Sequence, residues 1–162
     1  MHVAELNIAR PLYPLDDPRI AEFMEALDRV NAVAERSEGF VWRLKGEGND
    51  ATHLPYEAEP GAIVNMSVWE SVDALQRFVW TTVHRRFVDR KPQWFAKAPT
   101  RDFVMWWVEP GHVPTLPEAT GRLERLRRVG STDEAFGWDH VPPRRWLGRV
   151  AEEDAEGPRR AL

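Results

Sequence analysis

The fold of this chain is decided by residues 62–95, which read AIVNMSVWESVDALQRFVWTTVHRRFVDRKPQWF. Residues 62–69 alternate between an apolar and a mixed set, as in a β-strand: Val64, Met66 and Val68 against Ile63, Asn65, Ser67 and Trp69. Ser71 then suits the N-cap of a helix, and Asp73 suits its first turn. Apolar residues recur at three- and four-residue spacing as far as Pro92, where a helix breaks or ends. This stretch therefore predicts a strand that leads directly into a helix.

The same patterns predict the remaining elements on either side of this stretch. Alternation predicts strands at residues 1–8, 40–44 and 102–109, and the last of these is apolar on both faces. Such a strand is expected inside a sheet or at a subunit interface. A helix follows Asp17, and Thr115 with Glu118 forms a capping box for an appended helix. The order β-α-β-β-α-β predicts a ferredoxin-like α+β sandwich with a four-stranded antiparallel sheet.

The two faces of the predicted sheet differ in polarity. We assign the apolar face, which carries Val64, Met66 and Val68, to the two helices. The mixed face would then lie uncovered, which favours a homodimer that pairs two sheets and leaves a pocket between sheet and helices. The domain is expected to span residues 1–130. Residues 131–162 form a C-terminal extension whose aromatic residues dock and whose last dozen residues are disordered.

Bulk composition excludes several classes of function. The 162 residues suit one domain, and the absence of cysteine rules out disulfides, thiolate nucleophiles and cysteine-based metal sites. A net charge of -4 with dispersed arginines argues against nucleic acid as a partner. No apolar run is long enough to cross a membrane, and the N-terminal residues lack the pattern of a secretory signal. A cytoplasmic protein is expected.

Candidate site residues gather on the mixed face and on the second helix. His84 is the leading candidate, because imidazole titrates near neutrality and can take a proton or bind iron. Asn7, Asn65 and Ser67 can bind a carbonyl or a developing enolate, or can satisfy one another. Arg43 can neutralise a carboxylate of a ligand, or it can form an ion pair with Glu5. Aromatic ligand-binding positions complete the set: Trp69, Trp80 and Trp107.

A resemblance to a known family is carried by Asn7 in the first strand and by five segments further along the chain. These segments are NMSVWES, FVWTTVHRRF, KPQWF, MWWVEPGH and PTLPEATGRLERLRRVG. Together they resemble a bacterial family of small uncharacterised proteins in the dimeric α/β-barrel superfamily, alongside the antibiotic-biosynthesis monooxygenases. The resemblance implies a ferredoxin-like subunit that dimerises into a barrel, and a place in secondary metabolism. Haem-degrading relatives have an Asn on the first strand and a His and a Trp on the helix. Asn7 and His84 match two of those positions, with Trp80 or Trp69 as the third.

Three hypotheses of function remain open on these grounds. The first is a monooxygenase-like enzyme without a cofactor, in which His84 deprotonates a hydrophobic, aromatic metabolite and Asn7 and Asn65 stabilise the anion. A cyclase or isomerase could use the same proton chemistry. The second is a haem protein with His84 as the axial ligand, although Trp80 lies only one helical turn from it. The third is a small-molecule binding module without catalysis.

Overall fold

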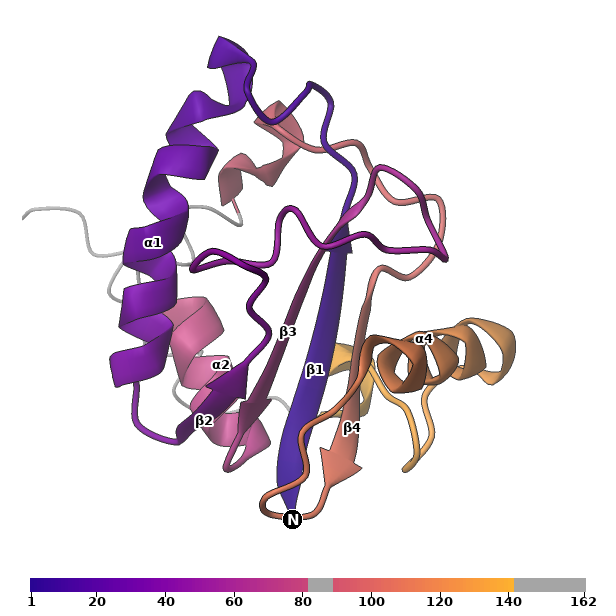
Figure 1. Cartoon of the computed structure of the whole chain (residues 1–162). Helices are drawn as coiled ribbons and strands as arrows, with labels where there is room; N and C mark the ends of the chain where they lie inside the picture. Colours follow the sequence, from indigo (N-terminus) through magenta and orange to yellow (C-terminus); the bar gives the residue numbers. More distant parts are fainter. Residues whose placement is uncertain (82–88, 142–162) are drawn as a thin grey trace, which may run out of the picture.

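The computed structural model describes residues 1–81 and 89–141, and Figure 1 shows a sheet with helices on both sides. Four strands form this sheet in the order β2-β3-β1-β4, and all neighbours are antiparallel. The strands are β1 (His2–Ala9), β2 (Phe40–Arg43), β3 (Ile63–Trp69) and β4 (Phe103–Val108). The helices are α1 (Ala21–Arg36), α2 (Val72–Thr81) and α4 (Leu116–Val129). The predicted ferredoxin-like α+β fold and the appended helix are confirmed.

The helices begin where the sequence predicts their caps. Ser71 Oγ accepts a hydrogen bond from the backbone N–H of Ala74 at the start of α2, at 3.2 Å. Thr115 Oγ1 accepts one from the N–H of Glu118 at the start of α4, at 3.3 Å. Asp17 likewise caps the short turn that leads into α1. Each cap satisfies a backbone donor that the helix itself leaves unpaired.

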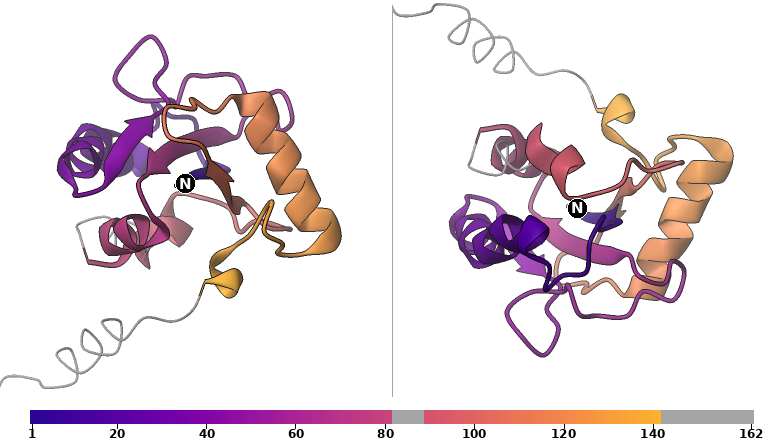
Figure 2. Two further views of the ribbon diagram at one scale, coloured as in Figure 1. Left: turned by 90° about the horizontal axis from the view of Figure 1, so that it is seen from below. Right: turned by 90° about the horizontal axis from the view of Figure 1, so that it is seen from above.

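Each face of the sheet is covered by different helices, as Figure 2 shows. The side chains of one face, here called the α4 face, pack against α4 and the connection between β2 and β3. They are Ala4, Leu6, Ile8, Val64, Met66, Val68, Val104, Trp106 and Val108. The opposite face, here called the pocket face, lies toward α1 and α2. Its side chains include Val3, Glu5, Asn7, Asn65, Ser67, Trp69, Phe103 and Met105.

The predicted assignment of these faces is wrong. The apolar face was expected against the first two helices, but α4 covers it, with Leu123 and Leu126 fully buried there. The mixed face was expected to lie uncovered, but α1 and α2 cover it and leave a pocket. Alternation shows which residues share a face, and it cannot show which helix packs on that face.

Strand β4 lies at an edge of the sheet, so the interior position is excluded, and the other predicted place, a subunit interface, stays a prediction. Its outer side is paired to the later chain, since Met105 and Phe136 exchange two backbone hydrogen bonds of 2.7 and 2.9 Å. Trp138 stacks on Phe103 with ring centroids 5.3 Å apart. These contacts explain why the strand is apolar on both faces without a further strand beside it. Phe136 and Trp138 dock as expected, whereas Trp146 lies outside the described residues.

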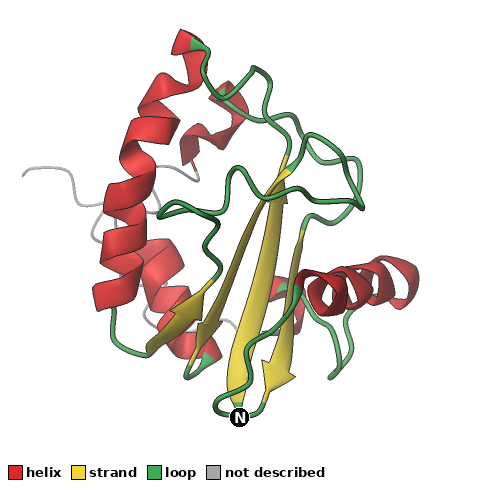
Figure 3. Ribbon diagram, in the orientation of Figure 1, coloured by secondary structure: helices red, strands yellow, loops and turns green. Residues whose placement is uncertain are grey.

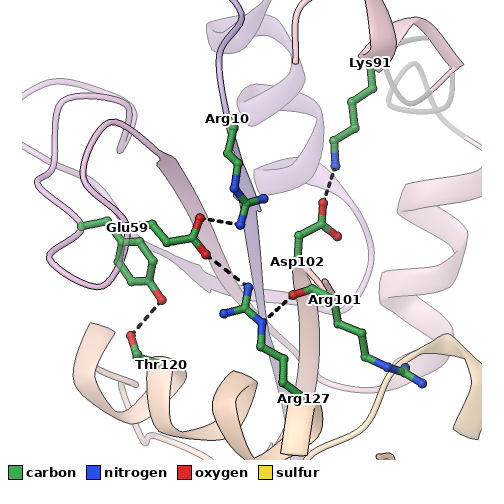
Figure 4. Close-up of polar contacts among 8 residues, drawn as sticks. Arg10, Glu59, Lys91, Arg101, Asp102, Thr120 and Arg127 are labelled. Carbon is green, nitrogen blue, oxygen red and sulfur yellow. Dashed lines mark hydrogen bonds and ion pairs between the residues drawn. The ribbon is translucent and has the colours of Figure 1, made fainter. Parts of the chain in front are cut away.

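Polar contacts hold α4 and the connection between β2 and β3 onto the sheet (Figure 4). Figure 3 shows that this connection is a long loop without helix or strand. Glu59 in the loop accepts from Arg127 Nη2 of α4 at 3.2 Å and also pairs with Arg10 after β1. Thr120 Oγ1 donates to the hydroxyl of Tyr56 at 3.0 Å.

Within the described ranges, no helix has the length and apolar character that crossing a membrane requires.

Candidate functional site

A pocket of about 320 Å³ lies between the pocket face of the sheet and helices α1 and α2. Its volume falls in the range of about 300–1,000 Å³ that is typical of small-molecule sites. Most of the wall is apolar or aromatic. Side chains of this kind include Phe23, Leu27 and Val30 of α1, Leu75, Phe78, Val79 and Trp80 of α2, and Trp94, Phe95, Phe103 and Trp138. Such a wall suits a largely hydrophobic ligand.

The floor of the pocket is polar and is formed by two central strands. Glu5 and Asn7 of β1 lie directly opposite Ser67 and Asn65 of β3 in the antiparallel pairing. All four residues line the pocket. Successive residues on one face of a strand are about 7 Å apart, so these groups lie within reach of one small molecule. We call these four side chains the pocket floor.

The pocket floor carries two amide side chains, those of Asn7 and Asn65. Among the described residues, neither Asn7 nor Asn65 has a side-chain hydrogen-bond partner. Asn65 is exposed although β3 is an interior strand, so solvent reaches it through the pocket. An amide can both donate and accept hydrogen bonds. These two groups are therefore free to bind a polar atom of a ligand.

Glu5 is a buried carboxyl for which the sequence suggested only a possible ion pair with Arg43. Its side chain is 4% exposed, and Ser67 Oγ donates to its Oε1 at 2.5 Å. The indole N–H of Trp69 donates in turn to Ser67 Oγ at 2.9 Å. Burial raises the pKa of Glu5 to about 7, although the hydrogen bonds from Ser67 oppose the rise. The sequence did contain a signal for a functional role of Glu5, since an acidic residue at an inward position of a strand is unusual. Only the packing shows that this residue is buried.

Arg43 does not pair with Glu5, so that alternative is wrong. Its Nε donates to Glu35 of α1 at 2.9 Å, and its Nη2 donates to the Asn49 side chain at 2.9 Å. The Asn49 amide donates to Asp28 at 2.8 Å. Arg43 is 5% exposed and lines the pocket. Because its donors are already engaged by Asn49 and by Glu35, a carboxylate that it shares with Lys45, Arg43 is a weaker candidate for binding an anionic ligand.

The three candidate tryptophans occupy different environments. Trp69 is fully buried, stacks on Phe78 at 5.1 Å and contacts Phe40 edge-on at 5.3 Å between ring centroids. Trp80 is half-buried and lines the pocket. Trp107 does not line the pocket, because it is 37% exposed and packs on Phe136. The structure therefore brings Trp69 and Trp80 to the site and leaves Trp107 outside it.

His84 lies outside the described residues, so its place in the pocket stays a prediction. His112, a weaker candidate for chemistry, pairs through Nε2 with Glu118 at 2.8 Å on the α4 side. Burial raises the pKa of Glu118, but hydrogen bonds from His112 and Trp106 outweigh it and keep that pKa below its ordinary value. This pair stabilises the start of α4 and takes no part in the pocket.

Haem finds no support among the described residues. No histidine of these residues lines the pocket, and Arg43 is already engaged by Glu35 instead of being free for a propionate. No group of three or more histidine, aspartate or glutamate side chains in the described ranges could hold a metal ion.

Two further pocket-lining residues, Lys91 and Asp102, form an ion pair of 3.2 Å (Figure 4).

Solved structures resemble this fold at low sequence identity. A conserved protein from Methanosarcina mazei Go1 superposes with a TM-score of 0.50 and 9% identity, covering 67% of this chain and 94% of that chain. SnoaB, a cofactor-independent oxygenase from Streptomyces nogalater, gives a TM-score of 0.46 and 20% identity over 72% of this chain and 98% of its own. A Chloroflexus aurantiacus protein assigned to the antibiotic biosynthesis monooxygenases gives 0.45 and 14%, over 70% and 98%.

At these identities the likeness concerns the fold alone. A comparison with curated proteins gives no match. A family profile matches residues 2–149, so this chain belongs to the family described as Domain of unknown function (DUF3291).

Proposed function

We propose that this protein is a monooxygenase-like enzyme that binds a hydrophobic, aromatic small metabolite in the pocket and acts on it by proton transfer. The observation that carries the proposal is the pair of amides beneath an aromatic wall, Asn7 and Asn65, which have no side-chain hydrogen-bond partner among the described residues. A strand interior that is packed for stability alone would bury apolar residues at these positions. Two unpaired amides there suit a ligand with a polar atom at its centre.

The arrangement supports chemistry at a C–H group that is conjugated with a carbonyl group. The ring system of the ligand packs on the wall that includes Trp80, while its oxygen accepts hydrogen bonds from Asn7 and Asn65. Loss of a proton from the conjugated carbon leaves an enolate, which the amides stabilise. An electron-rich enolate can reduce molecular oxygen, and the resemblance of the sequence to monooxygenases favours that step. His84, predicted from sequence, remains a candidate base.

Anthrone, a three-ring ketone with an acidic CH₂ group, is a suitable probe for this reaction. One anthrone and one oxygen molecule give one anthraquinone and one water, so oxygen uptake and anthraquinone absorbance should rise together. The wild-type protein should bind anthrone under nitrogen and accelerate its oxidation in air. Val30→Trp, which fills the pocket, should abolish both effects, whereas Val129→Trp on an exposed position of α4 should not.

Each outcome of this experiment decides between hypotheses. Binding with oxidation that depends on the pocket supports the monooxygenase-like enzyme. Binding under nitrogen without any oxidation in air would leave a binding module and contradict the oxygenase. Absence of binding, with Val30→Trp indistinguishable from the wild type, would contradict the proposed site.

Homodimer formation and a cytoplasmic location also remain proposals. Large apolar side chains are exposed where β1 begins and β4 ends, which supports a contact with a second copy: Met1, Trp107 and Val113. Light scattering during gel filtration should give twice the mass of the chain, and Val113→Lys should shift it toward the monomer. A monomer at all protein concentrations would contradict the dimer.

A further inference from the structure

Glu5 is the one ionisable side chain of the pocket floor, and the proposed function so far gives it no role. We propose that Glu5 is the residue that exchanges a proton with the ligand of this pocket, and that Ser67 and Trp69 act as its positioning residues. This inference rests on the proposed function, since it names the group that performs its proton transfer. Glu5, a strand residue, thereby takes the role of base that the sequence predicted for His84.

The position of Glu5 suits this role. It lies on β1, one inward position from Asn7 and directly opposite Ser67. The spacing along a strand puts its carboxyl about 7 Å from the residue that should bind the ligand's oxygen. In a three-ring ketone such as anthrone, the carbon that loses a proton lies across the central ring from the oxygen-bearing carbon and is conjugated with it. One planar ligand can therefore contact the amides with its oxygen and Glu5 with its C–H group.

The hydrogen-bond chain fixes the orientation of the carboxyl. An indole nitrogen can only donate, so Trp69 must donate to Ser67 Oγ, and Ser67 must then donate its own proton to Glu5. Trp69 is itself held between Phe40 and Phe78. A rigid tryptophan thus positions a serine, which positions the carboxyl at the pocket. Such support is what a proton-transferring group requires.

The charges near Glu5 explain how it can be protonated or ionised near neutrality. Four charged side chains line the pocket besides Glu5, and none of them forms an ion pair with it in the described part of the chain. They are Arg43, Asp50, Lys91 and Asp102. Helices α1 and α2 contribute no charged lining residue in the described ranges. Burial without a counter-ion raises the pKa of Glu5 to about 7, which suits a group that must both accept and return a proton.

The proposed step conserves atoms and electrons. The ionised Glu5 removes a proton from a carbon that is conjugated with the carbonyl group of the ligand. The C–H bond breaks, an O–H bond forms on Glu5, and the electron pair moves to the ligand's oxygen as an enolate. Asn7 and Asn65 donate hydrogen bonds to that oxygen. In the reverse step the carboxylic acid returns the proton to the carbon.

Deuterium exchange into anthrone measures this step without oxygen. Anthrone is incubated with the protein in D₂O under nitrogen, and loss of its CH₂ signal is followed by proton NMR. The wild-type rate should rise with pH and level off above about pH 7, as Glu5 ionises. Glu5→Gln, which keeps shape and a hydrogen-bond acceptor for Ser67, should reduce the rate about 100-fold or more. Glu124→Gln on the exposed side of α4 is the matched control and should change nothing.

Ser67→Ala separates positioning from a merely structural role. Loss of the side-chain hydrogen bond should raise the pH at which exchange levels off and lower the rate, because that bond favours the ionised carboxyl. Ser67→Thr, which keeps the hydroxyl, should restore the wild-type pH profile. An unchanged profile in Ser67→Ala would contradict the positioning role.

Two further results distinguish this inference from the proposed function. If Glu5→Gln binds anthrone and exchanges deuterium at the wild-type rate while His84→Gln does not, Glu5 is not the base and the proposed function stands. If the wild type binds no anthrone, carbon-13 NMR of protein labelled at glutamate carboxyls still tests Glu5. A carboxyl that titrates near pH 7 and is missing in Glu5→Gln supports the inference. A Glu5 carboxyl with an ordinary pKa overturns it.

Discussion

The two faces of the sheet use the same strands for different purposes. On the α4 face, Leu6, Met66 and Trp106 are fully buried among other apolar side chains. On the pocket face, the alternate positions of the same strands carry Glu5 and Asn65, one buried without a counter-ion among the described residues and the other open to solvent. One face is therefore packed with apolar side chains throughout, whereas the other combines a buried apolar cluster with polar groups that add little to stability.

This difference indicates where the chain gives up stability for binding. Burying polar groups on a sheet costs free energy unless each finds a partner. The pocket face retains such groups beneath α1 and α2, while α4, joined after the last strand, covers the apolar face.

Leu123→Ala should have the largest effect, because Leu123 is fully buried between α4 and the sheet. The cavity should lower the free energy of unfolding by about 2–5 kcal/mol, as measured by urea denaturation. Leu27→Ala, at a half-buried position that already lines the pocket, should cost about 1 kcal/mol or less. Equal losses in the two variants would show that the faces do not differ in their contribution to stability.

Glu5→Gln should stabilise the protein in alkaline solution. The folded pKa of Glu5, about 7, lies above its ordinary value of 4.5, so wild-type stability should fall as pH rises through this window. The variant lacks this loss and should be more stable by about 3 kcal/mol at pH 9, with little difference at pH 4. Urea denaturation at several pH values, with Glu124→Gln as the control, measures the effect. A constant difference between wild type and variant at all pH values would contradict the raised pKa.

Asn65→Ala should separate binding from stability on the pocket face. Because its amide has no partner among the described residues, the free energy of unfolding should change by less than about 0.5 kcal/mol. Affinity for anthrone, measured by fluorescence titration, should fall about tenfold. Asn49→Ala, which removes an amide that links Arg43 to Asp28, should instead cost about 1 kcal/mol of stability. If Asn65→Ala is the more destabilising of the two, the amide has a structural role.

Thr115→Ala should have the smallest effect, since it removes only the cap of α4. The expected loss is about 1 kcal/mol, measured by thermal unfolding. Thr115→Ser, which keeps the capping hydroxyl, serves as the control and should lose only a few tenths of a kcal/mol. A full loss in the serine variant would indicate that the methyl group, and not the cap, matters here.

Local signals predicted most of the fold. Alternation in β1 and β3 and the caps at Ser71 and Thr115 depend on neighbouring residues, so the sequence contains them directly. The side on which α4 packs depends on tertiary contacts of Leu123 and Leu126, which no local pattern encodes. The edge position of β4 escaped prediction for the same reason, because Phe136 supplies its outer contact from far along the chain.

The candidate site was likewise predicted in part from local sequence patterns. Residues that alternate on one strand face share an environment, which grouped Asn7, Asn65 and Ser67 on the wall of a single pocket. The importance of Glu5 depends on its burial and on the absence of a counter-ion, and both follow from packing. Neither alternative for Arg43, a ligand carboxylate or Glu5, included its partner Glu35, because Glu35 comes close only when α1 folds back over β2.

The pairing of Met105 with Phe136 has a consequence for how this sheet meets other proteins. An open strand edge can recruit a strand from another molecule and so begin aggregation. Here the backbone groups of Met105 are already used by the chain's own later segment. At the opposite edge, β2 has only four residues, and its register shifts between Phe40 and Trp42. Neither edge offers a long regular template, so we expect copies of this chain to meet through side chains and not by extending the sheet.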